Sequence, residues 1–168
     1  EQEYLWKGMR RGAIQTVSTD HCSFTLAQKD MGREDFTKIP GGLPGVETRG
    51  ELLYSYGVAK RKISAAQMCR VLSENPARLY GLYPRKGVLR PGSDADIVVY
   101  DPGASHVIRA EDCVANVDYN PYEGFVTAGG IRQVWLGAAL RGKRKGPGGG
   151  AGGQVYGPGQ ELPVSTRP

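Results

Sequence analysis

The pattern of apolar residues changes near residues 83–86, and this change limits the possible folds more than any other feature. Before it, the spacing predicts a strand over residues 14–17 and helices over residues 4–10 and 51–58. After it, residues 86–92 predict a short strand and a turn. Strands are predicted over residues 95–101, 106–109 and 131–136, the last pairing with 138–140 around Gly137. We therefore predict an α/β region followed by a mostly β region.

A further helix is predicted to begin at Ser64. Ser64 and Gln67 have the spacing of a capping box, in which each side chain binds the backbone N–H group of the other residue. Asn75-Pro76 is expected to end this helix and to open the next one over residues 77–82, because proline is favoured in a first helical turn.

The basic charge of the chain is concentrated in its last segment. Residues 141–168 contain 9 Gly and 4 Pro in 28 residues, a composition typical of disorder, and 5 basic residues against 1 acidic residue. Residues 1–140 then carry 17 basic and 16 acidic side chains. A basic tail could bind nucleic acid, but no aromatic stacking pattern accompanies it, so we expect a solvated tail and no nucleic-acid partner.

Cysteine spacing and hydropathy indicate the compartment. The 3 cysteines lie far apart and no pair has C-x-x-C spacing, which favours reduced thiols in a cytoplasmic protein. No apolar run reaches the length of about 18 residues that a membrane span needs, so no membrane partner is expected. The sequence starts without a methionine or a signal peptide, and we expect it to begin inside a longer protein.

Thr19-Asp20-His21-Cys22 directly follows the predicted strand and is the strongest indication of chemistry. Barrel enzymes place metal ligands and general bases at the carboxyl ends of their strands. A metal site needs three or four protein ligands, however, and the chain has only 2 histidines. The alternative is that Asp20 caps a loop or a helix start and that His21 binds the loop backbone. Cys22 has no adjacent base, which disfavours a role as nucleophile.

Three loop segments have both a functional and a structural interpretation. The Pro-Gly-Gly-Leu-Pro-Gly stretch over residues 40–45 could bring bare backbone close to a ligand, or it could be an ordinary surface loop. The two carboxylates within residues 92–96 could bind a cation, but a local turn is the simpler interpretation. Residues 117–124 could form a binding loop, although turn residues and packed tyrosines favour a structural role.

Several stretches, taken together and in order, resemble the C-terminal part of the hydantoinase and dihydropyrimidinase family of cyclic amidohydrolases. The resemblance covers about residues 1–137 and is carried by residues 18–24, 35–42, 45–47, 73–87, 91–102 and 118–124. It implies an α/β fold in which residues 1–84 are the C-terminal units of a metal-dependent (β/α)8 TIM barrel. Residues 85–140 would be the C-terminal part of a small β-sandwich domain, and residues 141–168 the tail.

The resemblance also implies a reaction and roles for single residues. Members of this family hydrolyse the cyclic amide bond of hydantoins or dihydropyrimidines with a binuclear centre, usually of zinc, and act as homotetramers. By resemblance Asp20 is a metal ligand and a catalytic proton relay. Gly41 stands where the family usually has an asparagine whose backbone contacts the substrate ring. Cys22 falls near the pocket for the exocyclic group of the substrate.

Most of the family's metal ligands have no counterpart in this chain. The His-x-His pair, a carboxylated lysine and two further histidines precede the position that matches Glu1, so the chain alone is expected to be inactive. A second hypothesis is a non-catalytic relative that acts in assembly or interaction. The presence of Asp20 favours the enzyme. In either case, a partial barrel is expected to expose strand edges and an apolar face and to associate.

Overall fold

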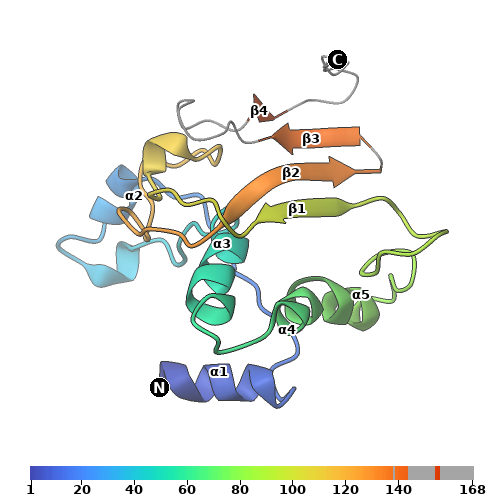
Figure 1. The fold of residues 1–168 in the computed structure, drawn as a ribbon. Coiled ribbons are helices and arrows are strands. Elements are labelled where there is room, and N and C mark those ends of the chain that lie inside the picture. The colour runs from blue at the N-terminus through green and yellow to red at the C-terminus, as the bar shows by residue number, and fades with distance from the viewer. Residues whose placement is uncertain (138, 144–153, 156–168) are drawn as a thin grey trace.

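The computed structural model describes residues 1–137, 139–143 and 154–155, which form a helical part and an antiparallel sheet (Figure 1). The helices are α1 (Gln2–Arg10), α2 (Leu26–Asp30), α3 (Arg49–Leu53), α4 (Ala65–Cys69) and α5 (Asn75–Leu79), with 3₁₀ turns η1 (Phe36–Lys38) and η4 (Ala110–Asp112) and π-helical turns η2 (Tyr54–Val58) and η3 (Arg70–Glu74). The strands are β1 (Ile97–Asp101), β2 (Gly130–Leu136), β3 (Ala139–Lys143) and β4 (Gln154–Val155), in the order β1-β2-β3-β4.

The predicted helices over residues 4–10 and 51–58 are confirmed as α1 and as α3 continued by η2. The predicted start at Ser64 is also confirmed. Ser64 Oγ accepts a hydrogen bond from Gln67 N at 3.1 Å, and Gln67 Oε1 accepts one from Ser64 N at 2.8 Å. Each end of this capping box therefore satisfies a backbone donor that the first helical turn leaves free.

The predicted helix break at Asn75-Pro76 is wrong. Asn75 has helical backbone angles (φ −64, ψ −44), and the helix continues from α4 through η3 into α5. In the π-helical pattern the residue at position 76 would donate to Val71 O, but proline has no N–H group. Val71 O instead accepts a hydrogen bond from Val17 N at 3.1 Å. The proline therefore frees a carbonyl that tethers a distant segment to the helix.

The predicted strand over residues 14–17 is also wrong, because no strand among the described residues pairs with it. Besides the bond to Val71, the segment is held at its start by Ile14 N donating to Gly8 O at 3.2 Å. Asn75 Nδ2 donates to Gln15 O at 2.8 Å. A strand requires a hydrogen-bonded neighbour, and these single contacts to helices cannot form a ladder.

The β region agrees with the sequence in its longer strands only. β1 and the β2–β3 hairpin around Gly137 (φ +59) are confirmed, although residue 138 lies outside the described residues. The predicted strand over 106–109 is reduced to one bridge between Val107 and Val126. Part of the expected tail, residues 141–143 and 154–155, lies in β3 and β4, and its other residues lie outside the described part of the chain.

Of the short strand and turn predicted over residues 86–92, the strand is absent and the turn is present, closed by ion pairs. Lys86 Nζ lies 3.0 Å from Asp94 Oδ2 and also binds Asp96. The hydrogen bond from Lys86 lowers the pKa of Asp96 below its usual value. Arg85 O accepts a bond from Asp94 N at 2.8 Å. The carboxylates of residues 92–96 are therefore used to close a turn.

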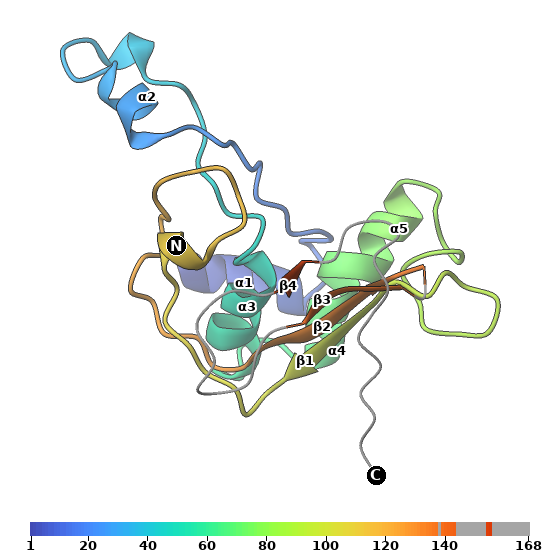
Figure 2. The same ribbon diagram turned by 90° about the horizontal axis from the view of Figure 1, so that it is seen from above.

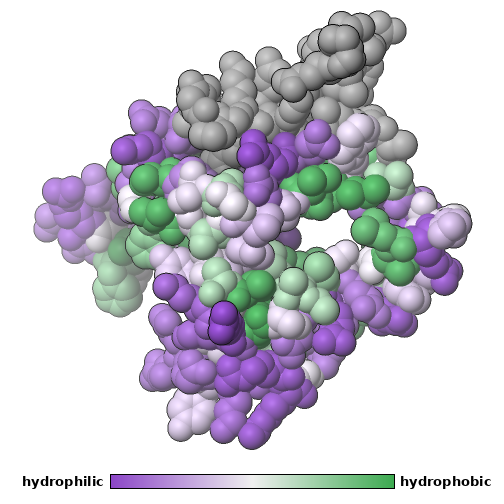
Figure 3. All heavy atoms as spheres, viewed as in Figure 1, coloured by the Kyte–Doolittle hydropathy of each residue, from purple (hydrophilic) through white to green (hydrophobic). Residues whose placement is uncertain are grey.

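The buried apolar core is small and lies between α1, α3 and the long α4–α5 helix (Figure 1). Its centre is made by Met9, Leu53, Ile63 and Val71, and Trp6 packs against it. A segment that contains α2 and η1 projects away from this body (Figure 2). Apolar side chains also reach the surface in several patches (Figure 3). Within the described residues, none of the helices has the length and apolarity that crossing a membrane requires.

Candidate functional site

Asp20 lies at the surface where the segment tethered to Val71 turns into the next loop. Its backbone has φ +47, a left-handed conformation that aspartate tolerates better than most residues. Asp20 O accepts a hydrogen bond from Cys22 Sγ at 3.3 Å. Among the described residues the Asp20 carboxylate has no hydrogen-bond or ion-pair partner. Its charge is therefore directed to solvent and available to a ligand.

His21 connects the loop that contains Asp20 to residues 40–45, which we call the glycine-rich loop. Its Nδ1 accepts hydrogen bonds from Gly45 N at 3.0 Å and from Val46 N at 3.3 Å. Because Nδ1 is an acceptor in both, the proton of the neutral ring is on Nε2, which lies 2.9 Å from Ser23 Oγ. Both ring nitrogens are thus engaged within the protein. The structural interpretation of His21 as a partner of the loop backbone is supported.

The glycine-rich loop packs directly against Cys22. Cys22 N donates to Leu43 O at 3.1 Å. Gly42 has φ +100, and a Cβ atom placed on it would lie 2.4 Å from Cys22 Sγ. Gly41, in contrast, has nothing within 4 Å of the place that a Cβ atom would take, and neither of its backbone groups has a hydrogen-bond partner in the described part of the chain. The glycine-rich loop and the loop of Asp20 are therefore neighbours that meet at Cys22. The backbone of Gly41 is left accessible to a ligand.

We expect a large loss of stability at one of two neighbouring glycines and almost none at the other when alanine replaces them. Gly42→Ala should lower the free energy of unfolding by about 2 kcal/mol, because it combines a positive φ with a collision against Cys22. Gly41→Ala should change it by less than about 0.5 kcal/mol, since the position is open. Urea unfolding of the two variants measures the difference. Equal losses at both positions would contradict this description of the loop.

A cavity of about 330 Å³ lies beside the start of the Asp20 loop. Apolar and aromatic residues form most of its wall, together with Ser18, Thr19 and Gly45. Arg49 also lines it, and its guanidinium group donates to Val17 O at 3.5 Å. The cavity is therefore bordered both by residues 17–19 and by the glycine-rich loop.

Residues 113–120 lie beside the same loops and are held by two carboxylates. Glu47 accepts hydrogen bonds from Val114 N at 3.0 Å and from Ala115 N at 2.5 Å. Asp118 Oδ1 accepts one from Leu26 N at 2.9 Å. The hydroxyl of Tyr119 is buried without a partner in the described residues, and burial is the main cause of its raised pKa. Sequence reasoning took Tyr119 as a packed tyrosine and missed this unpaired donor.

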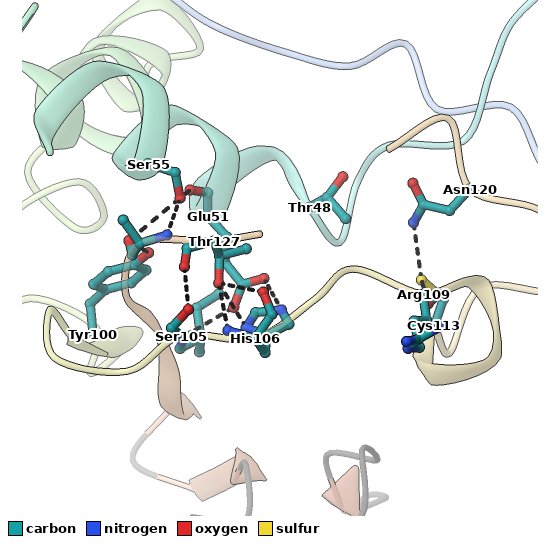
Figure 4. A network of polar contacts seen from close by, with 12 residues as sticks. Thr48, Glu51, Ser55, Tyr100, Ser105, His106, Arg109, Cys113, Asn120 and Thr127 are labelled. Carbon is teal, nitrogen blue, oxygen red and sulfur yellow. Dashed lines mark hydrogen bonds and ion pairs between the residues drawn. The ribbon is translucent and has the colours of Figure 1, made fainter. Parts of the chain in front are cut away.

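A buried polar network joins α3 to the β region (Figure 4). His106 Nε2 lies 3.2 Å from Glu51 Oε2, and His106 Nδ1 lies 2.9 Å from Thr127 Oγ1. Glu51 Oε1 also accepts a hydrogen bond from Ile131 N at 3.2 Å. A hydroxyl, an imidazole and a carboxylate in this order resemble a nucleophilic triad, but Thr127 is only 2% exposed and cannot meet a substrate. The network is therefore structural, and sequence reasoning missed it.

The donors near Asp20 fit one ligand of a metal site but not a complete site. In the described part of the chain, no group of three or more His, Cys, Asp or Glu side chains is placed to hold a metal ion. The Asp20 carboxylate is open, whereas both nitrogens of His21 are occupied by the loop. Because a protein metal site takes three or four protein ligands, any metal here would need further donors from outside these residues.

The chain is similar to known enzymes over most of its length. The model of the amidohydrolase family matches residues 1–151. A D-phenylhydantoinase of Escherichia coli O1:K1 is 48% identical over 132 residues, which is 78% of this chain and 29% of the relative. The solved structure of D-hydantoinase from Bacillus sp. AR9 is similar with a TM-score of 0.81 and 44% identity, over 83% of this chain and 31% of that one. The structure of dihydropyrimidinase from Brevibacillus agri is similar with a TM-score of 0.82 and 45% identity, over 83% of this chain and 31% of that one. The chain thus spans less than a third of each relative.

Proposed function

Because this chain belongs to the amidohydrolase family, we propose that it is the C-terminal part of a metal-dependent enzyme that hydrolyses the cyclic amide bond of hydantoins or dihydropyrimidines. One observation carries the proposal. The unpaired carboxylate of Asp20 lies next to a loop in which both backbone groups of Gly41 are open to a ligand. The loop and the carboxylate are fixed to one another through Cys22 and His21.

The proposal assigns residues 1–84 to the last units of a (β/α)8 barrel and residues 85–140 to part of a small β-sandwich. Two features support it. The backbone N–H groups of Thr16 and Ser18 have no partner among the described residues, as expected for a segment that becomes a strand only when another part of the protein pairs with it. Large apolar side chains such as Leu5 and Leu43 are more than half exposed, and further chain would cover them.

In this enzyme Asp20 would act as a metal ligand and as a proton relay. A carboxylate can accept a proton from the attacking water and pass it to the ring nitrogen as that nitrogen leaves. When bound, the metal centre would supply Lewis-acid activation of the water and of the ring carbonyl. We propose zinc as the metal, with the remaining ligands outside this chain. The 168 residues alone would then lack activity.

The backbone of Gly41 is suited to a cyclic amide substrate. Hydantoins and dihydropyrimidines carry C=O and N–H groups around the ring, and a peptide backbone offers one donor and one acceptor that can pair with them. Because Gly41 has no side chain, a ring can approach this backbone closely. We propose that Cys22, packed against the next residue of the loop, lies near the exocyclic group of the substrate.

The proposal is tested in a fused chain. In this fusion, the part of the E. coli D-phenylhydantoinase that has no match in the 168 residues is placed before residue 1. The purified, folded fusion should hydrolyse 5-phenylhydantoin or dihydrouracil in the presence of zinc, and removal of the metal by a chelator should stop the reaction. A folded, metal-loaded fusion that turns over neither compound would overturn the proposed function.

A further inference from the structure

Lys29 binds the carbonyl groups of Pro40 and Gly42, the residues before and after Gly41. Its side chain leaves α2 and donates hydrogen bonds to Pro40 O and, at 2.6 Å, to Gly42 O. The ammonium group also lies 5.2 Å from the centre of the Phe24 ring. Within the described residues no carboxylate pairs with Lys29. Because an ammonium group has three N–H donors and no acceptor, it is well suited to hold two carbonyl oxygens.

The helix that carries Lys29 is itself fixed at both ends. At its start, Thr25 and Gln28 form a capping box, and Leu26 N donates to Asp118 Oδ1 at 2.9 Å. After its end, a Cβ atom on Gly32 would lie 1.9 Å from Ile39 Cγ1, so the chain returns in close contact just before the glycine-rich loop. Lys29 is therefore held in place by contacts at both ends of its helix.

These contacts determine where the backbone of Gly41 points. The peptide bond between Pro40 and Gly41 is not among the cis bonds, so it is trans and planar. In a trans peptide the C=O and N–H groups point in opposite directions. When Lys29 holds Pro40 O, the Gly41 N–H group is therefore directed to the side away from Lys29. The bond to Gly42 O holds the peptide between Gly42 and Leu43 and so anchors the chain just after Gly41.

We propose that Lys29 is a positioning residue for the substrate, which acts by fixing the direction of the Gly41 backbone. The inference rests on the proposed function of this loop. Lys29 does not touch the ring. It presents the donor and the acceptor of Gly41 in the orientation that the ring needs, and without it the loop can turn these groups away.

Steady-state kinetics of the fused chain tests the proposal. Lys29→Met should raise KM about tenfold and leave kcat within about threefold, since it removes binding rather than a chemical step. Lys29→Arg, which keeps donors for both carbonyls, should restore KM to within about threefold. The control is Lys38→Met, which removes an exposed lysine of the same projecting segment whose partner is Asp35 at 3.6 Å, and it should change neither constant. A merely destabilised protein would lose active enzyme and lower kcat with KM unchanged, and that result would overturn the proposal.

Amide hydrogen exchange of the 168-residue chain separates this inference from the proposed function. Lys29→Met should accelerate exchange in residues 41–45 because the loop opens more often, and Lys38→Met should not. Unchanged exchange together with unchanged KM would overturn the role of Lys29. A third outcome is that Lys29→Met accelerates exchange but the fusion without any substitution is inactive. This outcome would show that Lys29 anchors the loop, and it would overturn both the proposed function and the role of Lys29 in positioning a substrate.

Discussion

Replacing Asp20 by asparagine in the fused chain should lower kcat/KM by at least about a thousandfold. Asparagine keeps the size of the side chain but cannot accept the proton, and it is a weaker, neutral ligand. Loss of general acid–base catalysis alone accounts for a factor of about 10² to 10⁴, and a weaker metal site adds to it. The measurement is steady-state hydrolysis of 5-phenylhydantoin at saturating zinc, accompanied by the metal content of each protein.

Two controls separate chemistry from folding in this experiment. Asp30→Asn removes another exposed carboxylate, which pairs with Arg33 at 3.1 Å, and it should retain nearly full activity. Asp20→Asn should also leave the urea midpoint of the 168-residue chain nearly unchanged, because the carboxylate has no partner among the described residues. Equal activity of the two variants would show that Asp20 is not part of the site.

Replacing Glu51 by alanine should lower the free energy of unfolding by about 3 kcal/mol. Glu51 is 6% exposed and bonds both His106 and the backbone of Ile131. Its removal leaves a partly buried N–H group without an acceptor and takes the carboxylate from the imidazole, and each loss is expensive away from water. Urea unfolding followed by the fluorescence of Trp6 and Trp135 measures the effect.

Matched variants show whether this loss comes from the network. Glu51→Gln keeps an oxygen for Ile131 N and should lose less stability than Glu51→Ala. Glu111→Ala removes an exposed glutamate and should change stability by less than about 0.5 kcal/mol. If Glu51 and His106 act together, the double alanine variant should lose less than the sum of the single losses, by about 1 kcal/mol or more. Strict additivity would contradict a coupled network.

Local patterns in the sequence were sufficient for elements that depend on neighbouring residues. The capping box at Ser64, the helix α1 and the hairpin around Gly137 each follow from residues within a few positions of one another. The segment 14–17 failed because a strand also needs a neighbour, and none is present among the described residues. Pro76 failed as a helix stop because the π-helical turn before it, with a distant donor at Val17, accommodates the missing N–H group.

The sequence singles out candidate site residues but not the contacts that support them. Asp20 was singled out by its place after an apolar run, and Cys22 and Gly41 by the family resemblance; the structure places the three in adjoining loops, and their roles stay predictions. The contacts that hold them, from Lys29 and His21 to the glycine-rich loop, join side chains to backbone groups far along the chain. No periodicity or spacing marks such bonds, because any lysine or histidine can reach a carbonyl or an amide that the fold brings near.

We propose that this chain contributes an essential share of a cyclic amidohydrolase and does not act alone. The most direct measurement mixes the 168-residue chain with the separately purified remainder of the E. coli relative and follows hydrolysis of 5-phenylhydantoin with zinc. Neither polypeptide alone should turn over the substrate, and the mixture should do so at a rate that saturates near equal amounts. Metal-dependent hydrolysis by the 168-residue chain on its own would contradict the account.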